Sequence, residues 1–224
     1  MRVKIHLSPP SHPGYIPFSY QHKLTGAFHR ILCQNSVHDE TSLYSLGWLS
    51  RGLVVPNKGF AYPKGATWTI NFHDNELAFR FLAKAHQDGE IAFGMRAYKF
   101  ETIPTPRFSG TYRFIAQSPI LVRDNSVEGA ADHVLFSDPR ADALLTRTFR
   151  NKMELAGLSD EDKSSWMGFD RSYIKAKRKP VTIKNSRMIA NECPILVSGT
   201  PNAVRFAWNV GAGHLTGSCF GHLK

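Results

Sequence analysis

Residues 24–32 carry the clearest pattern in the chain and read Leu24-Thr25-Gly26-Ala27-Phe28-His29-Arg30-Ile31-Leu32. The apolar side chains recur every three or four residues, which predicts an amphipathic α-helix with one buried stripe. We expect Ser19 to cap this helix. Before it, Val3, Ile5 and Leu7 alternate with polar residues, as in a half-buried strand. A strand followed by an amphipathic helix predicts a mixed α and β fold.

The residues up to 103 add further elements. We expect a second short helix within 39–51, containing Leu43, Tyr44, Leu46 and Trp48, then strands at 53–55, 59–62 and 67–72. Asp74 or Asn75 caps another helix, with Ala78, Phe81, Leu82 and Ala85 buried, which Gly89 ends. Residues 91–103 are expected to form one long strand. The order strand, helix, strand, strand, helix, strand predicts a ferredoxin-like unit: an antiparallel sheet with helices on one face.

The second half begins after Pro104-Thr105-Pro106, which predicts a domain boundary between residues 1–106 and 107–224. We expect strands at 111–116, 119–122, 194–198 and 203–210. Ser137-Asp138-Pro139 predicts the start of a helix that ends near residue 156, before Gly157. These elements predict a second ferredoxin-like domain, so the fold class is α+β with two tandem βαββαβ domains.

The composition indicates a globular protein that binds a polyanion. The 224 residues carry a net charge of +10 at pH 7 and have a pI near 9.7, which favours binding to nucleic acid over a merely basic soluble enzyme. The sequence contains no apolar run long enough for a membrane span, and the N-terminus does not resemble a signal peptide. Three widely spaced cysteines predict no disulfide framework, so we expect a reducing cytosol.

Polar residues align on the face of the helix opposite its apolar stripe. His22, Gly26, His29 and Cys33 are spaced by four, three and four residues, which places them on one edge. Gly26 leaves room for a ligand to approach between the two histidines. An ordinary solvated helix face is the competing interpretation. No carboxylate or second cysteine completes a ligand set there, so we expect no metal ion.

Two basic stretches and a glycine-rich tail are further candidates for binding. Lys175, Lys177 and Lys179 alternate, so a strand would place them in one row beside Tyr173, although lysines also protect edge strands. Arginines on the helix from 138 to 156 face outward, as on a solvated helix face; they are Arg140, Arg147 and Arg150. Glycines let the tail approach a phosphate or another backbone closely; they are Gly211, Gly213, Gly217 and Gly221. Leu215 and Phe220 favour a structured, ligand-facing loop over a flexible linker.

Together these features resemble the CRISPR repeat-processing endoribonucleases of the repeat-associated mysterious protein (RAMP) superfamily. The resemblance rests on residues 16–29, on Ser118-Pro119-Ile120-Leu121-Val122, on the glycine-rich 211–221, and on length and basicity. It implies two ferredoxin-like domains and metal-independent cleavage of CRISPR precursor RNA within its repeats. The products would be a 5′-hydroxyl and a 2′,3′-cyclic phosphate, and no cofactor is needed. The implied partners are precursor and mature repeat RNA, a CRISPR effector complex and a second copy of the chain, with no membrane.

The family's catalytic residue is usually a histidine in or just after the first helix, and the position carried over is His29. Histidine suits the chemistry because both of its protonation forms are accessible near neutral pH. His22 is the candidate for a second proton transfer. Candidate phosphate or leaving-group partners are Lys23, Arg30, Tyr44 and Arg51. RNA contacts are expected from the basic row, the helix arginines and the four glycines.

The sequence departs from the family pattern at two places. The usual Gly-x-Gly near the chain end is Cys219-Phe220-Gly221, and residues 43–48 hold no histidine. The alternative function is therefore a non-catalytic RNA-binding subunit of a CRISPR effector complex. An unrelated basic protein with ordinary surface histidines is a third hypothesis.

Overall fold

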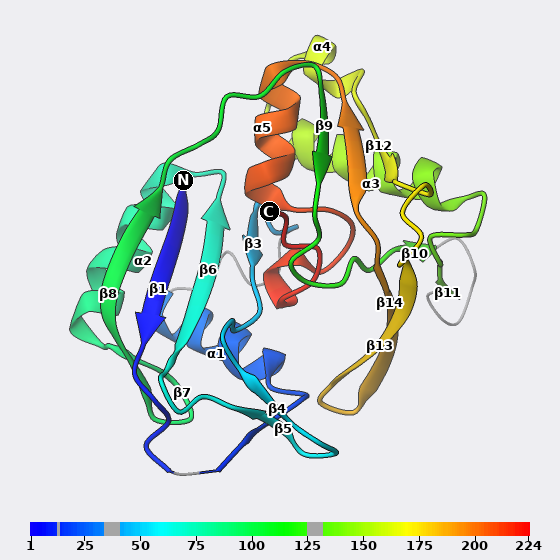
Figure 1. Cartoon of the computed structure of the whole chain (residues 1–224). Coiled ribbons are helices and arrows are strands. Elements are labelled where there is room, and N and C mark those ends of the chain that lie inside the picture. The colour runs from blue at the N-terminus through cyan, green and yellow to red at the C-terminus, as the bar shows by residue number, and fades with distance from the viewer. Residues whose placement is uncertain (13, 34–40, 125–131) are drawn as a thin grey trace.

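The computed structural model describes residues 1–12, 14–33, 41–124 and 132–224. Helices and antiparallel sheets form two ferredoxin-like units, which confirms the predicted α+β class. In Figure 1 the first unit lies on the left, in blue to green, and the second on the right, in green to orange. The C-terminal segment, in red, lies between them near the N-terminus.

The first unit is built on a five-stranded antiparallel sheet of order β3-β6-β1-β8-β7. Its strands are β1 (Arg2–Leu7), β3 (Tyr44–Leu46), β6 (Ala66–Phe72), β7 (Glu90–Ala92) and β8 (Met95–Ile103). Strand β1 pairs with β6 on one side and with β8 on the other. Helices α1 (Gln21–Leu32) and α2 (Asn75–Gln87) cover one face of this sheet (Figure 1).

The core of this unit follows the predicted periodicities. Val3, Ile5 and Leu7 of β1 are buried, as is the α1 stripe. Phe28 of α1 stacks on Tyr44 of β3, with ring centroids 4.6 Å apart, and on Phe81 of α2, at 5.3 Å. Helix α2 starts as expected, because the Asp74 side chain accepts a hydrogen bond from the Glu76 amide. The N-cap of α1 is Tyr20, not Ser19, and no side chain caps that helix.

The prediction of one long strand over residues 91–103 was wrong. The chain forms the hairpin β7–β8, and Phe93 and Gly94 turn it with φ of 56° and 70°. Two successive positive φ values suit the right-handed twist of the flanking strands. The sequence does not indicate this turn, because Phe93 precedes the glycine and Phe is a typical strand residue.

The helix predicted within residues 39–51 is also wrong; residues 39 and 40 lie outside the described part of the chain. Tyr44–Leu46 form strand β3, paired with Phe72–Ile70 of β6. All three β3 residues are buried. A strand covered on both faces lacks the alternation that distinguishes it from a helix, so its apolar spacing misled the prediction.

The second unit has a three-stranded antiparallel sheet of order β12-β15-β9. The strands are β9 (Thr111–Phe114), β12 (Trp166–Phe169) and β15 (Ile195–Ser198), and the helices are α3 (Ala141–Leu155), α4 (Asp160–Lys163) and α5 (Pro201–Val210). Helix α3 packs on β12, and α5 packs on β9 and β15. The order β9, α3, β12, β15, α5 follows the ferredoxin-like pattern up to its last strand, in whose place Leu223 makes an isolated bridge to Ala116.

The strand predicted at residues 203–210 is therefore a helix, α5. Thr200 caps it by accepting a hydrogen bond from the Ala203 amide, and Pro201 occupies the first turn. Ala203, Val204, Ala207 and Trp208 are among its buried residues. Aromatic and β-branched residues made this segment resemble a strand, whereas the Thr-Pro start was the signal for a helix.

Smaller sheets complete the fold. They are β2 (Ile16–Pro17), β5 (Gly59–Ala61) and β4 (Leu53–Val55); the hairpin of β13 (Lys177–Ile183) and β14 (Ser186–Glu192); and the pair β10 (Arg123–Asp124) and β11 (Asp132–His133). The strand predicted at 119–122 is absent from this described stretch: Ile120 and Leu121 make isolated bridges to Asn191 and His214.

Each unit has its own hydrophobic cluster, one drawn mainly from residues 3–95 and one from residues 114–223. Residues 104–110 join β8 to β9 without regular structure. The boundary at residue 106 stays a prediction. No helix in the described ranges is long and apolar enough to cross a membrane.

Candidate nucleic-acid interface

The glycine-rich tail, residues 211–224, is buried between the two units. Gly211, Gly213 and Gly221 have φ of 75°, 73° and 59°, and a Cβ on Gly221 would lie 1.8 Å from the Ala212 carbonyl oxygen. Gly217 is buried against Ser42 and Tyr44. These four positions are glycine because the backbone packs against itself and its neighbours. Their burial argues against the direct RNA contact predicted for them.

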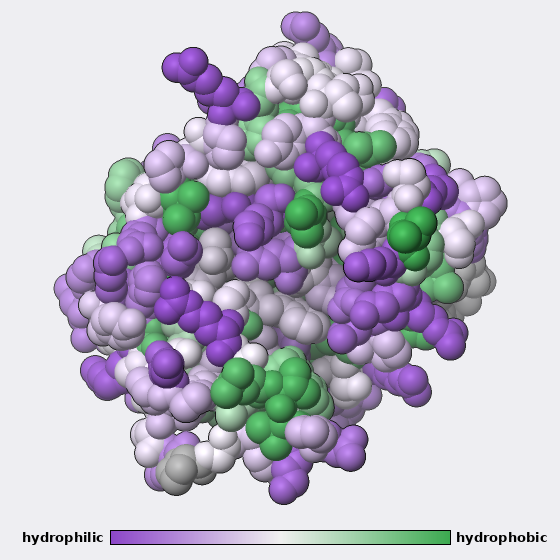
Figure 2. All heavy atoms as spheres, in the orientation of Figure 1, coloured by the Kyte–Doolittle hydropathy of each residue, from purple (hydrophilic) through white to green (hydrophobic). Residues whose placement is uncertain are grey.

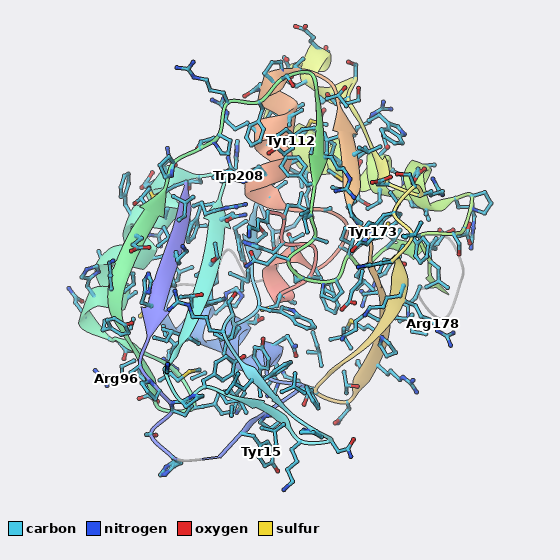
Figure 3. All side chains as sticks on the ribbon, viewed as in Figure 1. Tyr15, Arg96, Tyr112, Tyr173, Arg178 and Trp208 are labelled. Carbon is cyan, nitrogen blue, oxygen red and sulfur yellow. The ribbon has the colours of Figure 1, made fainter. Side chains whose placement is uncertain are left out.

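Hydrogen bonds tie the tail and α5 to the first unit. The Arg2 guanidinium donates to Asn71 Oδ1 at 2.7 Å and to the Leu223 carbonyl at 2.5 Å. It also lies 3.8 Å from the centroid of the Trp208 ring, which Figure 3 labels at the junction of the units. Burial lowers the pKa of Arg2 to about 9. The buried imidazole of His222 bonds Ser45 Oγ at 3.1 Å. The tail therefore joins the two units.

Cys219 takes a conformation that usually requires glycine. Its φ is 67°, and the thiol is buried near the carbonyl of Gln21 and the hydroxyl of Thr25, both in α1. Burial raises its pKa to about 12. The departure from Gly-x-Gly thus keeps the backbone shape and adds a contact with α1. All three cysteines are free thiols.

The polar edge of α1 forms over His22, Gly26 and His29, whereas Cys33 follows the helix as its C-cap, with φ of 57°. His22 and His29 are half-buried, and Gly26 and Cys33 are exposed. Apart from its chain neighbours and the adjacent backbone of α1, no heavy atom of the described residues lies within 4 Å of a Cβ built on Gly26, so the edge is open between the histidines. His22 Nδ1 lies 2.9 Å from the Ser19 carbonyl oxygen, which holds its ring toward the start of the helix. The ring of His29 contacts Phe28 edge-on, at 5.4 Å.

The predicted phosphate and leaving-group partners are scattered. Tyr44 is 2% exposed, and burial raises the pKa of its phenol, so this hydroxyl serves packing beside Gly217 and Ser42. Lys23 is exposed one position after His22. Arg30 pairs with Asp88 at 3.5 Å and bonds the Glu90 carbonyl, which directs it toward the end of α2. Arg51 is exposed, with φ of 74°.

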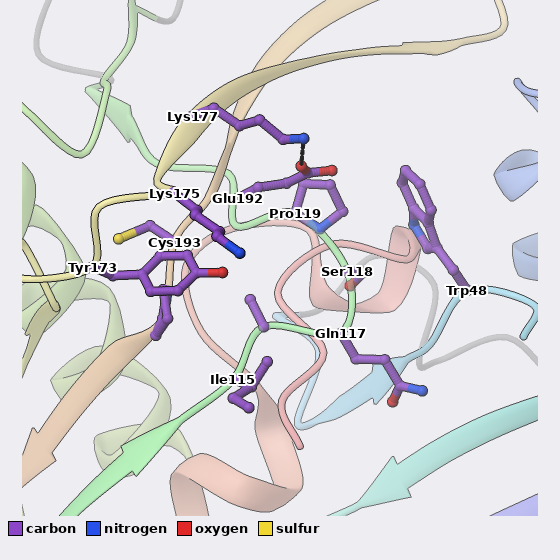
Figure 4. A pocket seen from close by; sticks show the side chains of 12 residues that line it. Trp48, Ile115, Gln117, Ser118, Pro119, Tyr173, Lys175, Lys177, Glu192 and Cys193 are labelled. Carbon is purple, nitrogen blue, oxygen red and sulfur yellow. Dashed lines mark ion pairs between the residues drawn. The ribbon is translucent and has the colours of Figure 1, made fainter.

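The basic row is shorter than predicted. Lys177 and Lys179 lie on one face of β13, but Lys175 precedes the strand. Glu192 on β14 pairs with both, at 3.2 Å to Lys177 and 3.4 Å to Lys179. Figure 4 shows Lys175, Lys177 and Tyr173 around a pocket of about 330 Å³, with Trp48 on its opposite side. Lys175 and Lys177 are therefore part of one wall of a pocket between the two units.

Trp48 also lines a second, larger pocket, and the sequence prediction missed this role. That pocket, of about 810 Å³, lies between β4–β5 and β13, and its walls include Phe18, Phe60, Lys58 and Lys179. Figure 2 shows hydrophobic residues gathered over β4 and β5, where Val54 is 66% exposed. We call the two pockets together the Trp48 groove. Trp48 is fixed there, because its Nε1 donates to the Cys219 carbonyl at 2.7 Å.

The α3 arginines divide into two groups. Arg140 pairs with Asp124 and Asp138, and Arg150 bonds the carbonyls of Ser164 and Ser165. Arg147 is exposed and lines a pocket of about 550 Å³, which it shares with Arg123, Lys152 and His214. The sequence prediction did not include Lys152, although its place in the buried stripe with Leu145 and Phe149 could have indicated it.

Comparisons with known proteins decide the family. Residues 103–224 match the family model described as CRISPR associated protein Cas6, C-terminal. The chain belongs to the Cas6 family. The match spans the second unit and the tail, so the resemblance drawn from the sequence is confirmed. No curated protein sequence matches this Cas6 chain.

Solved structures share the fold over the whole chain. A Cas6-related protein of Pyrococcus furiosus has a TM-score of 0.87 and 19% identity, and the match covers 100% of this chain and 97% of that one. A RAMP protein described as binding different RNA substrates has a TM-score of 0.86 and 17% identity, with 100% and 98% covered. A Cas6 product complex has a TM-score of 0.64 and 14% identity, with 99% and 98% covered. At these identities the similarity shows the tandem fold.

Across the described part of the chain, no three histidine, cysteine or acidic side chains gather as a ligand set. Metal independence stays a prediction, which the experiments below address.

Proposed function

We propose that this Cas6-family chain is an endoribonuclease that cleaves CRISPR precursor RNA within its repeats, without a metal ion, through His29. The observation that carries the proposal is the open edge of α1, where half-buried His29 faces the same side as exposed Gly26. Helical side chains of this spacing lie on one face, so RNA that approaches over Gly26 meets His29. Family membership supports the substrate class.

The chemistry is attack by a ribose 2′-hydroxyl on the adjacent phosphate. A base takes the 2′-hydroxyl proton, the new O–P bond closes the 2′,3′-cyclic phosphate, and the bond to the 5′-oxygen breaks. An acid then protonates that oxygen to leave a 5′-hydroxyl. His29 is the proposed proton-transfer group, and the exposed cation Lys23, near the start of the same helix, is assigned to attraction of the RNA backbone.

His22 is less suited to the second proton transfer. Seven residues separate it from His29, a rise of about 10 Å along the helix. Its hydrogen bond to the Ser19 carbonyl also holds the ring toward the opposite end. Since both proton transfers occur at one phosphate, we assign His22 to RNA contact and leave the second group open.

The RNA path proposed for the rest of the repeat is the Trp48 groove. The groove is lined by the aromatic side chains of Trp48, Phe18 and Tyr173 and by the lysines Lys58, Lys175, Lys177 and Lys179. Aromatic platforms beside lysines suit single-stranded RNA, because bases stack while cations meet the backbone. A CRISPR effector complex and a homodimer stay predictions.

The test is cleavage of cognate repeat RNA in EDTA. We expect wild-type cleavage, a loss of about 10²–10⁴-fold in His29→Ala with RNA binding retained, and wild-type rates for His12→Ala, which alters an exposed histidine off the helix. Undiminished cleavage by His29→Ala would exclude His29. Cleavage that needs Mg²⁺ would contradict the metal-free mechanism. Tight binding without any cleavage would establish the RNA-binding subunit instead.

A further inference from the structure

A cationic pocket lies beside the tail, away from the Trp48 groove. It has a volume of about 550 Å³, and its walls come from α3, the tail, β10 and the residues before β3. Arg123, Arg147 and Lys152 line it together with His214, and none of the described lining residues is acidic. Hydroxyl and amide groups also line it, and the tail residues Gly213 and Leu215 complete the lining; the hydroxyl and amide residues are Thr41, Ser42, Thr148, Asn151 and Thr216. The hydroxyls of Thr148 and Thr216 already donate to the carbonyls of Leu144 and Tyr44, so the cations are the main donors to a ligand in this pocket.

Lys152 is the buried member of the pocket. It is 3% exposed, and its Nζ donates to the Thr216 hydroxyl at 3.0 Å and the Val210 carbonyl at 3.3 Å. An ammonium has three donors, and the described residues accept from two. Burial lowers the pKa of Lys152 to about 7, so about half of the amines are protonated at pH 7, and no described lining residue is a carboxylate that would compensate the charge.

His214 is held as a neutral donor. Its Nδ1 accepts a hydrogen bond from the Arg123 amide at 3.3 Å, so the proton of the neutral ring is on Nε2. Burial first, and then the charges of Lys152, Arg123 and Arg147, lower the pKa of His214 to about 4. Arg123 also has a buried Nε with no hydrogen-bond partner among the described residues. The cations thus converge on one space lined by donors.

We propose that this pocket seats a phosphate group of the RNA backbone, outside the groove that holds the bases and apart from the α1 edge. A phosphate supplies the missing negative charge and accepts hydrogen bonds on several oxygens at once. Nucleotide-sized ligands fit a volume of this order. The inference rests on the proposed RNA substrate, but free phosphate shares the same chemistry, so the test uses both.

Binding of inorganic phosphate, followed by calorimetry at pH 7, tests the pocket without RNA. We expect wild type and Arg107→Gln to bind phosphate, and Arg147→Gln and Lys152→Met to bind it about tenfold more weakly. Arg107 is exposed and lines none of the pockets described above, so it controls for net charge. Arg147 is exposed, so its variant stays informative if loss of buried Lys152 impairs folding. Unchanged phosphate binding in Arg147→Gln would overturn the site.

Repeat RNA titrated at several salt concentrations tests the source of the phosphate. In Arg147→Gln we expect about tenfold weaker binding and a salt dependence reduced by about one counterion, whereas Arg107→Gln keeps the wild-type slope. Weakened phosphate binding with unchanged RNA binding would overturn the backbone assignment in favour of free phosphate. Failure of wild type to bind repeat RNA would contradict the proposed function, while the phosphate titration still reports on the pocket.

Discussion

Gly26 and Gly221 show how differently two glycines can serve one chain. Gly26 lies in an exposed turn of α1 with open space around it, whereas Gly221 has φ of 59° and lies against the Ala212 backbone. The sequence indicated both as sites of close approach. It could not show that one faces solvent and the other the interior, because that depends on packing between the two units.

Alanine at these positions should act in opposite directions. Gly26→Ala should raise the free energy of unfolding by about 0.5–1 kcal/mol, since alanine is the better helix former. Gly221→Ala should lower it by more than about 2 kcal/mol, because a Cβ there meets a carbonyl oxygen at positive φ. Urea denaturation of both variants measures the difference. Equal effects would contradict the packing described for the tail.

The buried imidazole of His222 makes the free energy of unfolding depend on pH. Burial first, and then Arg2, lower its pKa to about 3 in the folded chain, against about 6.5 when unfolded. The unfolded state therefore binds the proton first, so this contribution is complete above pH 6.5 and is lost as the pH falls toward 3.

Between pH 6.5 and 4, we expect His222→Asn to reduce the slope of the free energy of unfolding against pH by about 1.4 kcal/mol per pH unit. This slope corresponds to the uptake of close to one proton on unfolding. His12→Asn, at an exposed position, should keep the wild-type dependence. Urea titrations at several pH values measure both slopes. An unchanged slope in His222→Asn would show that the ring does not stay neutral in the folded protein.

At the scale of elements, the hydrophobic periodicity predicted the helices and strands that keep one solvated face. It gave the wrong type for elements that are almost fully buried. Strand β1 and helices α1 and α2 each keep one solvated face, so their patterns were readable. Strand β3 and helix α5 are covered nearly all round by elements distant in the sequence, and both were assigned wrongly. Of the candidate site, the α1 edge formed over His22, Gly26 and His29, but not at Cys33. The Trp48 groove and the cationic pocket join residues more than 70 positions apart, which no local pattern contains.

The β13–β14 hairpin leads to a prediction about charge. Glu192 pairs with Lys177 and Lys179, so it competes with RNA phosphates for both lysines. Glu192→Gln should tighten repeat-RNA binding by about two- to fivefold, and Lys177→Ala should weaken it, in filter binding at fixed salt. Glu154→Gln, which removes an exposed carboxylate paired with Lys163 on α4, should leave affinity unchanged. Weaker binding by Glu192→Gln would show that the carboxylate positions the lysines.

At the scale of the whole molecule, the tail is the joint between the two units. Cys219 belongs to the first hydrophobic cluster, and Ala212 and Leu223 belong to the second. The Trp48 groove and the cationic pocket both have walls from the first unit and from the second. A rigid tail therefore fixes the position of the proposed RNA path relative to the α1 edge. The net charge of +10 supplies the attraction along that path.

The proposed chemistry depends on a single ribose hydroxyl, and one substrate tests it directly. Repeat RNA carrying a 2′-deoxynucleotide only at the residue before the scissile phosphate should bind as tightly as the all-ribose RNA and remain uncut in EDTA. Wild-type cleavage of that substrate would contradict attack by the 2′-hydroxyl, and with it the proposed role of His29.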